Sequence, residues 1–249
     1  KGEFHETLRD VRVALADAEV DVQLNRRGTA VDLVGFDDVV LATGVTPRIP
    51  DVKGIDHPKV VTYLDVLRDH VSVGSTVAVM GAGGIGFDVA EYLTQSGPSA
   101  TVTPDRFYAE WGIDTSYSNR GGLTQVHLER PPRKITLLQR KHSKVGGGLG
   151  KTTGWIHRTE LKKRGVDMVP GVTYESIDDA GLHMTIDDQP VVLDVETIVV
   201  CTGQEPQREL LADLEAAPAT VHVIGGADVA AELDAKRAIK QGTEVAAAL

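Results

Sequence analysis

The hexapeptide GAGGIG, residues 81–86, constrains the fold more than any other stretch of the chain. An apolar segment, TVAVM at residues 76–80, precedes it, and an apolar-periodic segment, FDVAEYLTQ at residues 87–95, follows it. A glycine fingerprint between a buried strand and a helix is typical of a dinucleotide-binding α/β unit, whose helix N-terminus faces the pyrophosphate. The sequence therefore predicts a Rossmann-like domain with helices packed on a parallel sheet.

The glycines of this fingerprint have separate predicted roles. Gly81 permits the tight turn out of the strand, Gly83 lets the backbone approach the pyrophosphate, and Gly86 lets the helix pack closely on the sheet. Gly84 belongs to the same loop, so we include it among the predicted nucleotide contacts. The alternative is a plain tight turn between a strand and a helix.

The end of the second strand decides between NADH and NADPH. Asp105 lies about 20 positions after the fingerprint, where an acidic residue would favour NAD, but glycine and prolines interrupt the segment around it. KITLLQ, residues 134–139, is a cleaner strand that leads into Arg140 and Lys141. Because guanidinium and ammonium groups there suit a 2′-phosphate, we predict NADPH. The alternative is a solvated, charged strand end.

The segment VGGGLGKTTG, residues 145–154, looks like a phosphate-binding P-loop. That motif needs a glycine, then four residues, then Gly-Lys-Ser/Thr; with Gly150, Lys151 and Thr152 in the last places, Val145 occupies the position of the first glycine. We therefore predict no ATP site, and we expect the glycines to lie beside the dinucleotide while Thr152 or Thr153 caps the next helix. Lys144 and Lys151 are predicted to add charge near the phosphates, or else to be exposed loop lysines.

An internal repeat indicates two α/β units. A helical segment, a short strand at residues 20–24 and the buried strand of FDDVVLATG recur as GWIHRTELKKRG, VDMVPG and TIVVCTG. Only the second copy carries a strand, glycine fingerprint and helix ahead of it, so we expect the matching piece of the first copy to precede Lys1. We predict a partial first domain at residues 1–70, an inserted domain at residues 71–204 and a return to the first domain at residues 205–249.

Composition narrows the partners. A net charge of −10 disfavours nucleic acid, and no apolar run reaches the roughly 20 residues of a membrane span. The single cysteine, Cys201, excludes a disulfide framework and predicts a reducing, cytoplasmic location; its apolar neighbours predict a buried core thiol. His127, His142 and His157 lack metal-ligand spacing, so we predict no metal site.

The connection at residues 95–132 is longer than ordinary loops of α/β units. It carries four aromatic residues, Phe107, Tyr108, Trp111 and Tyr117. We expect this insertion either to pack on its own domain or to act as a lid or docking loop.

Four segments together resemble the C-terminal part of the bacterial NADPH-dependent 2,4-dienoyl-CoA reductase family: MGAGGIGFDVAEYL, EWGIDTSY, LLQRKHSKVGGGLGKTTGWIHR and IGGADVAAELDAKRAI. The resemblance implies an α/β flavoprotein fold with two dinucleotide-binding domains, a Rossmann-like NADPH domain inserted in a truncated FAD domain. It also implies a larger enzyme, with an old-yellow-enzyme-like barrel carrying FMN and a 4Fe-4S cluster. In that family, electrons pass from NADPH through FAD, the cluster and FMN to 2,4-dienoyl-CoA in the beta-oxidation of unsaturated fatty acids.

The resemblance also implies residue roles. For NADPH, the implied contacts are Gly81, Gly83, Ile85 and Gly86 with the pyrophosphate, Arg140 and Lys141 with the 2′-phosphate, and Gly203 beside the nicotinamide half. For FAD, they are Gly44, Gly226 and Asp228, with Gly28 near the adenine. Asp228 has an alternative role as the N-cap of the last helix. The chain lacks the barrel, the cluster cysteines and the first fingerprint, so its FAD site is incomplete, we assign no catalytic residue, and we expect no dienoyl-CoA reduction by this chain alone.

Two other functions stay open. One is a related FAD/FMN/iron-sulfur oxidoreductase of the old-yellow-enzyme-like type with another substrate, and the other is a nucleotide-binding or docking module without turnover. A disulfide reductase of the thioredoxin reductase type needs a cysteine pair, which a chain with Cys201 alone lacks.

Overall fold

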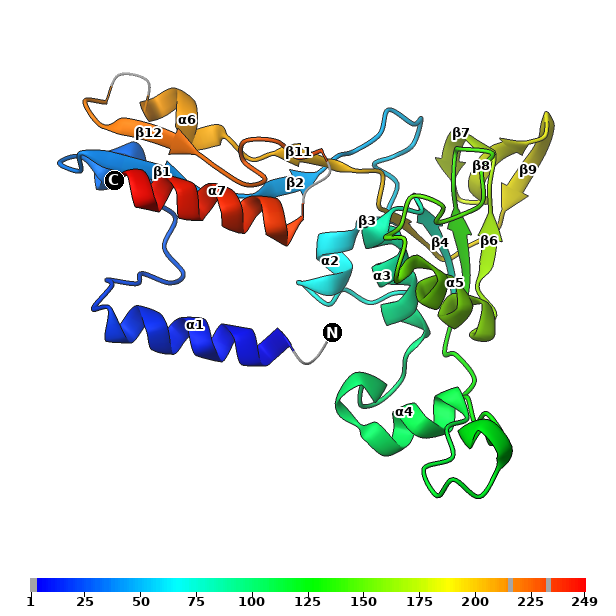
Figure 1. Ribbon diagram of the computed structural model, residues 1–249. Helices are drawn as coiled ribbons and strands as arrows, with labels where there is room; N and C mark the ends of the chain where they lie inside the picture. Colours follow the sequence, from blue (N-terminus) through cyan, green and yellow to red (C-terminus); the bar gives the residue numbers. More distant parts are fainter. Residues whose placement is uncertain (1–3, 215–216, 232–233) are drawn as a thin grey trace.

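The computed structural model describes residues 4–214, 217–231 and 234–249, and these form two α/β units (Figure 1). We call residues 52–203 the large unit, and residues 4–47 with 204–249 the small unit. The chain crosses between them at β2 (Val45–Pro47) and β11 (Gln204–Pro206), which pair antiparallel.

The large unit is built on one parallel five-stranded sheet. Its strand order is β3-β10-β4-β5-β6, and every neighbouring pair is parallel. The strands are β3 (Val60–Thr62), β10 (Thr197–Val200), β4 (Thr76–Met80), β5 (Lys134–Leu138) and β6 (Asp167–Val169). Since the strands are parallel, all their carboxyl ends lie along one edge of the sheet.

Both faces of this sheet are covered, as Figure 1 shows. On one face, Val77 and Val79 of β4 pack with Phe87 of α3 in a core that also includes residues of α2 and α5. On the other face, Ala78 and Met80 pack against the antiparallel sheet β7-β8-β9. Successive side chains of a strand point to opposite faces, so β4 supplies both cores and is buried throughout. The covering elements are α2 (Tyr63–Leu67), α3 (Gly84–Thr94), α5 (Gly154–Lys163), β7 (Val172–Asp178), β8 (Gly181–Ile186) and β9 (Gln189–Leu193).

The predicted α/β fold with a parallel sheet is confirmed, and β5 is the second strand beside β4. The alternative strand around residues 100–103 is instead a 3-10 turn, η3 (Ala100–Val102), and Asp105 lies in the first turn of α4 (Pro104–Trp111). The acidic residue that would favour NAD therefore does not end a strand of this sheet.

The antiparallel sheet β7-β8-β9 was not predicted. One face of this sheet packs on the parallel sheet. Its strands nevertheless alternate only partly between buried and exposed residues, so the sequence pattern that would predict them is weak. Asp187 and Asp188 both have positive φ, 48° and 60°, in the tight turn between β8 and β9. Aspartate pairs in such turns are a local signal of a hairpin.

The predicted boundary at residue 70 does not match the packing. β3 pairs with β10 in the large sheet, and Tyr63 and Val66 of α2 are buried in its core. Even Val52 packs in the second core. These segments cannot bury their apolar side chains in the small unit, so we propose that the inserted domain begins near residue 52.

The small unit has much less core. β1 (Asp38–Leu41) and β12 (Thr220–Val223) pair parallel, which returns the chain to the first unit after residue 204. Val39, Leu41 and Leu214 form its buried cluster, with partly buried neighbours from η2 (Ala30–Leu33) and α6 (Glu209–Leu214). The last helix, α7 (Ala235–Ala248), follows β12.

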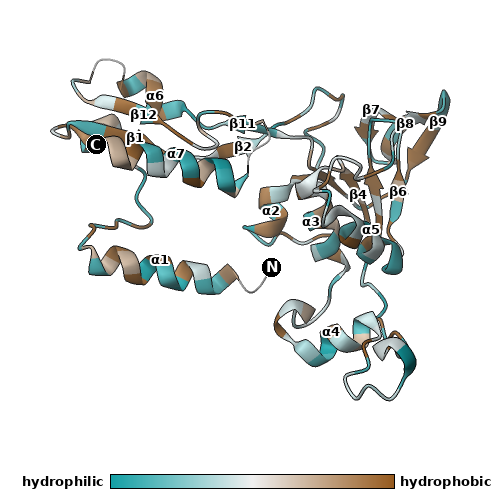
Figure 2. Ribbon diagram, in the orientation of Figure 1, coloured by the Kyte–Doolittle hydropathy of each residue, from teal (hydrophilic) through white to brown (hydrophobic). Residues whose placement is uncertain are grey.

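One predicted strand, at residues 20–24, is wrong. The structure shows no strand there, and these residues are exposed, because no described strand lies beside them to accept the backbone hydrogen bonds. The preceding helix α1 (His5–Asp17) has no buried residue and alternates apolar and polar residues around its surface (Figure 2).

The long insertion contains α4 and η4 (Arg120–Gly122) and is tied to α5 by charge. Glu110 of α4 is buried, and its carboxylate accepts hydrogen bonds from Arg106 Nε at 2.9 Å and Arg164 Nη2 at 2.6 Å. Lys163 lies 4.0 Å above the Trp111 ring. Packing on its own domain is therefore the observed arrangement of this helix, although Tyr117 remains 85% exposed.

Across the residues that the structure describes, no helix is both long and apolar enough to cross a membrane.

Candidate functional site

A cleft of about 440 Å³ lies at the carboxyl edge of the large sheet. It collects the ends of β4, β5 and β10, which is where open α/β sheets bind ligands. Among the residues that the structure describes, no acidic side chain lines it, although the chain carries a net charge of −10. The lining residues are Gly81, Ala82, Gly83, Gly84, Gln139, Arg140, Lys141, Ser143, Gly148, Leu149, Tyr174, Cys201, Thr202 and Gly203.

The glycine fingerprint forms one wall, and its geometry has the features that a pyrophosphate needs. Gly81 has φ +111°, which favours glycine, and a Cβ at Gly86 would overlap the carbonyl oxygen of Gly81. Gly83 is the N-cap of α3, and a Cβ at Gly83 or Gly84 would meet only open space. Backbone N–H groups at this helix end are therefore open to an anion. Ile85 packs its side chain against the core, so only its backbone can face the cleft.

The cationic wall comes from the end of β5, where Arg140 and Lys141 are exposed to the cleft. Gln139 fixes the turn that follows: its Nε2 donates to the carbonyls of Lys141 and Ser143 at 2.9 and 2.7 Å. Its Oε1 accepts from Gly146 N at 3.2 Å. The side-chain amide of Gln139 thus fixes the backbone of the turn that carries Arg140 and Lys141, which we call the cationic turn.

The glycine segment at residues 145–154 packs against the fingerprint helix. A Cβ at Gly146 would lie 2.5 Å from the Phe87 ring, and Arg158 Nη1 donates to Gly146 O at 2.9 Å. Gly148 and Leu149 line the cleft, so this segment lies beside the fingerprint; that its glycines lie beside the dinucleotide stays a prediction.

Two further expectations about this segment concern Thr153 and Lys144. Thr153 is the N-cap of α5, as expected, although its side chain makes no capping hydrogen bond. Lys144 lines a separate groove with Trp155 and Arg158 and does not line the cleft of Arg140, because the chain has already turned at the carbonyls held by Gln139.

Gly203 lies at the far end of the cleft, after β10, with φ +120°. Arg48 covers it: Arg48 N donates to Gly203 O at 3.0 Å, its guanidinium donates to Thr202 O, and Thr202 Oγ1 donates to Arg48 O at 2.9 Å. These bonds join the crossing between the two units to the edge of the cleft. Sequence reasoning missed Arg48 and Thr202, because their pairing spans 154 positions.

Tyr174 was also missed. It comes from β7 of the unpredicted antiparallel sheet, lines the cleft beside Arg140, and its hydroxyl lies 3.5 Å from Leu138 O. Burial raises the pKa of Tyr174 well above its ordinary value, so the hydroxyl stays protonated. Because Tyr174 lies in a strand with weak alternation, nothing in the local sequence indicated that it would line the cleft.

The sequence predicted a buried thiol at Cys201 and no metal site at the histidines. Cys201 is buried, and burial raises the pKa of its thiol to about 12. In the part of the chain that the structure describes, no group of three or more His, Cys, Asp and Glu side chains could hold a metal ion.

The residues predicted for FAD lie in the small unit. Gly44 and Gly226 follow the parallel strands β1 and β12, so both lie at the carboxyl edge of that pair. Asp228 Oδ2 accepts from Gln241 Nε2 of α7 at 2.8 Å, while Asp234 is the N-cap of α7. The N-cap alternative for Asp228 is therefore wrong. Gly28 lies in an exposed segment before η2, where an added Cβ would meet no described atom within 4 Å.

Comparison with known proteins gives one family match. A family model described as "Pyridine nucleotide-disulphide oxidoreductase" matches residues 4–239. The sequence is 26% identical over 223 residues to a metal reductase of Desulforamulus reducens, covering 86% of this chain. It is 36% identical over 90 residues to a cinnamate reductase of Clostridium sporogenes, covering 35% of this chain. A solved 2-naphthoyl-CoA reductase superposes with a TM-score of 0.75 over 96% of this chain at 21% identity.

The chain is much shorter than these proteins. It spans 32% of the metal reductase, 13% of the cinnamate reductase and 31% of the 2-naphthoyl-CoA reductase chain.

Proposed function

The chain belongs to the pyridine nucleotide-disulphide oxidoreductase family, and from this premise we propose that it is the NADPH-binding, electron-input part of a larger flavoprotein reductase. The large unit holds NADPH and the small unit contributes to FAD binding. The family implies both nucleotides, and the single Cys201 leaves this chain without a disulfide redox pair of its own.

The observation that carries the proposal is the cleft at the carboxyl edge. It brings the N-terminus of α3 and the cationic turn after β5 to one site, where no described acidic side chain lies in the lining. A helix N-terminus suits the pyrophosphate, and a guanidinium suits a 2′-phosphate. Gly81 and Gly83 approach the pyrophosphate through their backbone, while Arg140 and Lys141 bind the 2′-phosphate. Lys144 lies outside this cleft, so it adds charge only at longer range.

When bound, NADPH supplies a hydride and FAD accepts it. The chain's own residues orient the donor: Gly203, held by Arg48, borders the nicotinamide half, and Thr202 ties that edge to the crossing between the units. Gly44, Gly226 and Asp228 lie where they could border the flavin nucleotide, and Gly28 lies near its adenine.

For the terminal acceptor we assign a CoA ester of the 2,4-dienoyl-CoA type. The support is the resemblance of four segments, together with similarity to proteins named cinnamate reductase and 2-naphthoyl-CoA reductase. A partner barrel with FMN and a 4Fe-4S cluster, outside this chain, would pass the electrons on. The same module could serve another acceptor, a second candidate that the similarity to a metal reductase favours.

Binding of NADPH, NADH and ATP to the chain, measured by calorimetry, tests the nucleotide assignment. Replacing Arg140 with alanine should weaken NADPH binding by about 10- to 100-fold, because a charge-assisted contact is lost, while NADH binding changes little. Arg120→Ala, which removes an exposed arginine in the insertion, serves as the control. Equal losses for NADPH and NADH would move the 2′-phosphate site elsewhere, and preferential binding of ATP would overturn the dehydrogenase assignment.

A further inference from the structure

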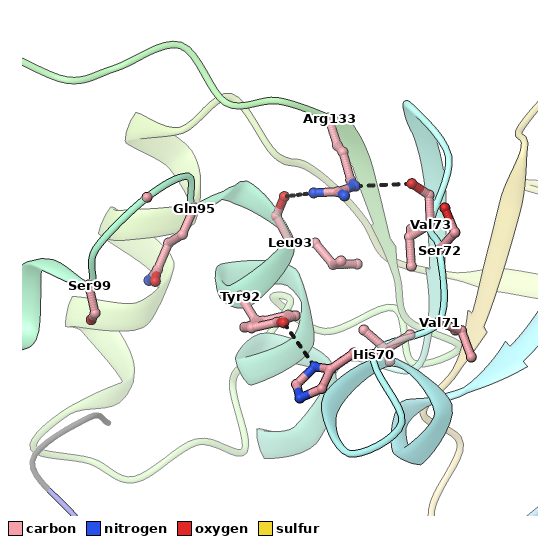
Figure 3. Close-up of a pocket in the computed structure, with 11 residues that line it drawn as sticks. His70, Val71, Ser72, Val73, Tyr92, Leu93, Gln95, Ser99 and Arg133 are labelled. Atoms are coloured by element: carbon pink, nitrogen blue, oxygen red, sulfur yellow. Dashed lines mark hydrogen bonds between the residues drawn. The ribbon is translucent and has the colours of Figure 1, made fainter.

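A second cavity, of about 590 Å³, lies at the opposite end of α3 from the nucleotide cleft (Figure 3). Tyr92 and Leu93 line it from the last turn of α3, and Val73 and Arg133 lie just before β4 and β5. It therefore opens at the amino edge of the sheet. The 11 residues of α3 separate the two sites by about 16 Å.

Arg133 in this cavity is poorly satisfied. Its Nε donates to Val73 O and its Nη1 to Leu93 O, both at 3.4 Å, as Figure 3 shows. Ordinary N–H···O bonds are about 2.9–3.0 Å, and a guanidinium has five N–H donors. Most of its donor capacity is left over.

Other arginines with little exposure behave differently. Arg164 lies 2.6 Å from the Glu110 carboxylate, and Arg106 lies 2.9 Å from the same group. Arg133 is half-buried, yet within the described ranges, 4–214, 217–231 and 234–249, it forms no ion pair with a carboxylate. A partly desolvated charge without a counter-ion is costly, and a bound anion removes that cost.

The other residues that line the cavity indicate what kind of anion it would fit. In the described part of the chain, no acidic residue lines the cavity. Val66 and Leu93 are buried and give an apolar floor, while Tyr92 and His70 lie side by side with 3.5 Å between Tyr92 Oη and His70 Nδ1 (Figure 3). A carboxylate could reach Arg133 while an apolar body covers the floor.

We propose that this cavity is a binding site for a small organic carboxylate, with Arg133 as its counter-ion. Because the cavity and the nucleotide cleft share no lining residue among those that the structure describes, the occupant does not compete with NADPH. The site goes beyond the electron-input function and does not depend on it.

Benzoate, benzamide and inorganic phosphate are the probes, titrated into the full chain by calorimetry and ligand-observed NMR. Benzoate should bind saturably, with a dissociation constant of about 1 mM or below, and saturating NADPH should not displace it. Benzamide, which lacks the charge, and phosphate, which lacks the apolar body, should each bind at least about tenfold more weakly. Absence of saturable benzoate binding, equal binding of benzamide or phosphate, or displacement by NADPH would each overturn the proposal.

Variants then locate the site. Arg133→Gln should weaken benzoate binding by about tenfold or more and leave NADPH binding unchanged, because only the carboxylate loses its partner. Arg130→Gln removes the same charge from an exposed position three residues away and should change neither affinity. Unchanged benzoate binding in Arg133→Gln would contradict the assignment. If that variant does not fold, the comparison of benzoate with benzamide on the unmodified chain still decides.

Discussion

Both units contain parallel strands, but they differ in how completely their sheets are covered. In the large unit, residues 77–80 of β4 are at most 1% exposed, because helices cover one face and the antiparallel sheet covers the other. In the small unit, β1 alternates between exposed and buried residues, with Val40 41% exposed, and α1 buries nothing. A parallel strand is stable when both of its faces are packed, so the repeat of elements alone does not give the two units equal stability.

The largest expected effect comes from matched leucine truncations in the two cores. Leu137→Ala should lower the free energy of unfolding by about 3–4 kcal/mol, because Leu137 is fully buried between the sheet and α3. Leu41→Ala, in the small cluster, should shift the main urea transition by less than about 1 kcal/mol and mainly speed hydrogen exchange in β1 and β12. Equal shifts of the main transition would show that the two units unfold together.

A second test asks whether the insertion at residues 95–132 contributes to the free energy of unfolding of the large unit. Glu110→Gln should cost about 2 kcal/mol in urea unfolding, since Arg164 is buried and would retain only Glu160 as an anionic partner. Glu129→Gln is the control, because this exposed carboxylate interacts with Arg106 and the Ser96 hydroxyl at the surface, and its loss should cost no more than about 0.5 kcal/mol. Similar small effects of both variants would mean that α4 unfolds independently of α5.

A third test compares two fingerprint glycines. Gly86→Ala should weaken NADPH binding at least about tenfold, or 1.4 kcal/mol, because the new methyl group meets the Gly81 carbonyl and pushes α3 from the sheet. Gly84→Ala places its methyl group in open space and should change binding far less. The measurement is a fluorescence titration of NADPH, and equal losses would contradict the close-packing role of Gly86.

The smallest expected effect uses Cys201 as a reporter of the large unit alone. Burial raises the folded-state pKa of its thiol to about 12, whereas an unfolded cysteine titrates near about 8.5. The stabilisation is thus complete below the unfolded pKa and is lost as the pH rises toward the folded pKa. Between pH 7 and 9, the unfolding free energy of the unmodified chain should fall by about 1 kcal/mol relative to Cys201→Ala. A constant difference across this range would mean that the thiol is not buried in solution.

The helices and strands that could be predicted from the sequence are those marked by a pattern within a short stretch of residues. Periodicity and the fingerprint are local patterns, and they predicted β4, α3, β5, α5 and β10. The three strands pair in one sheet, and the two helices pack on it. The strand at residues 20–24 had the same kind of local pattern but no described partner, so it did not form. The boundary at residue 70 was placed from sequence order, whereas Val52 and β3 follow the core that can bury them.

For the candidate site, the sequence by itself determined the components: a glycine turn before a helix, and two cations at the end of a strand. These follow from residue type and short spacing, which need no knowledge of the rest of the chain. Only the tertiary structure decided that Tyr174, Thr202 and Arg48 border the same cleft and that Lys144 does not. Parallel strands far apart in sequence bring their ends to one edge, and which side chains meet there depends on long-range packing that no local pattern records.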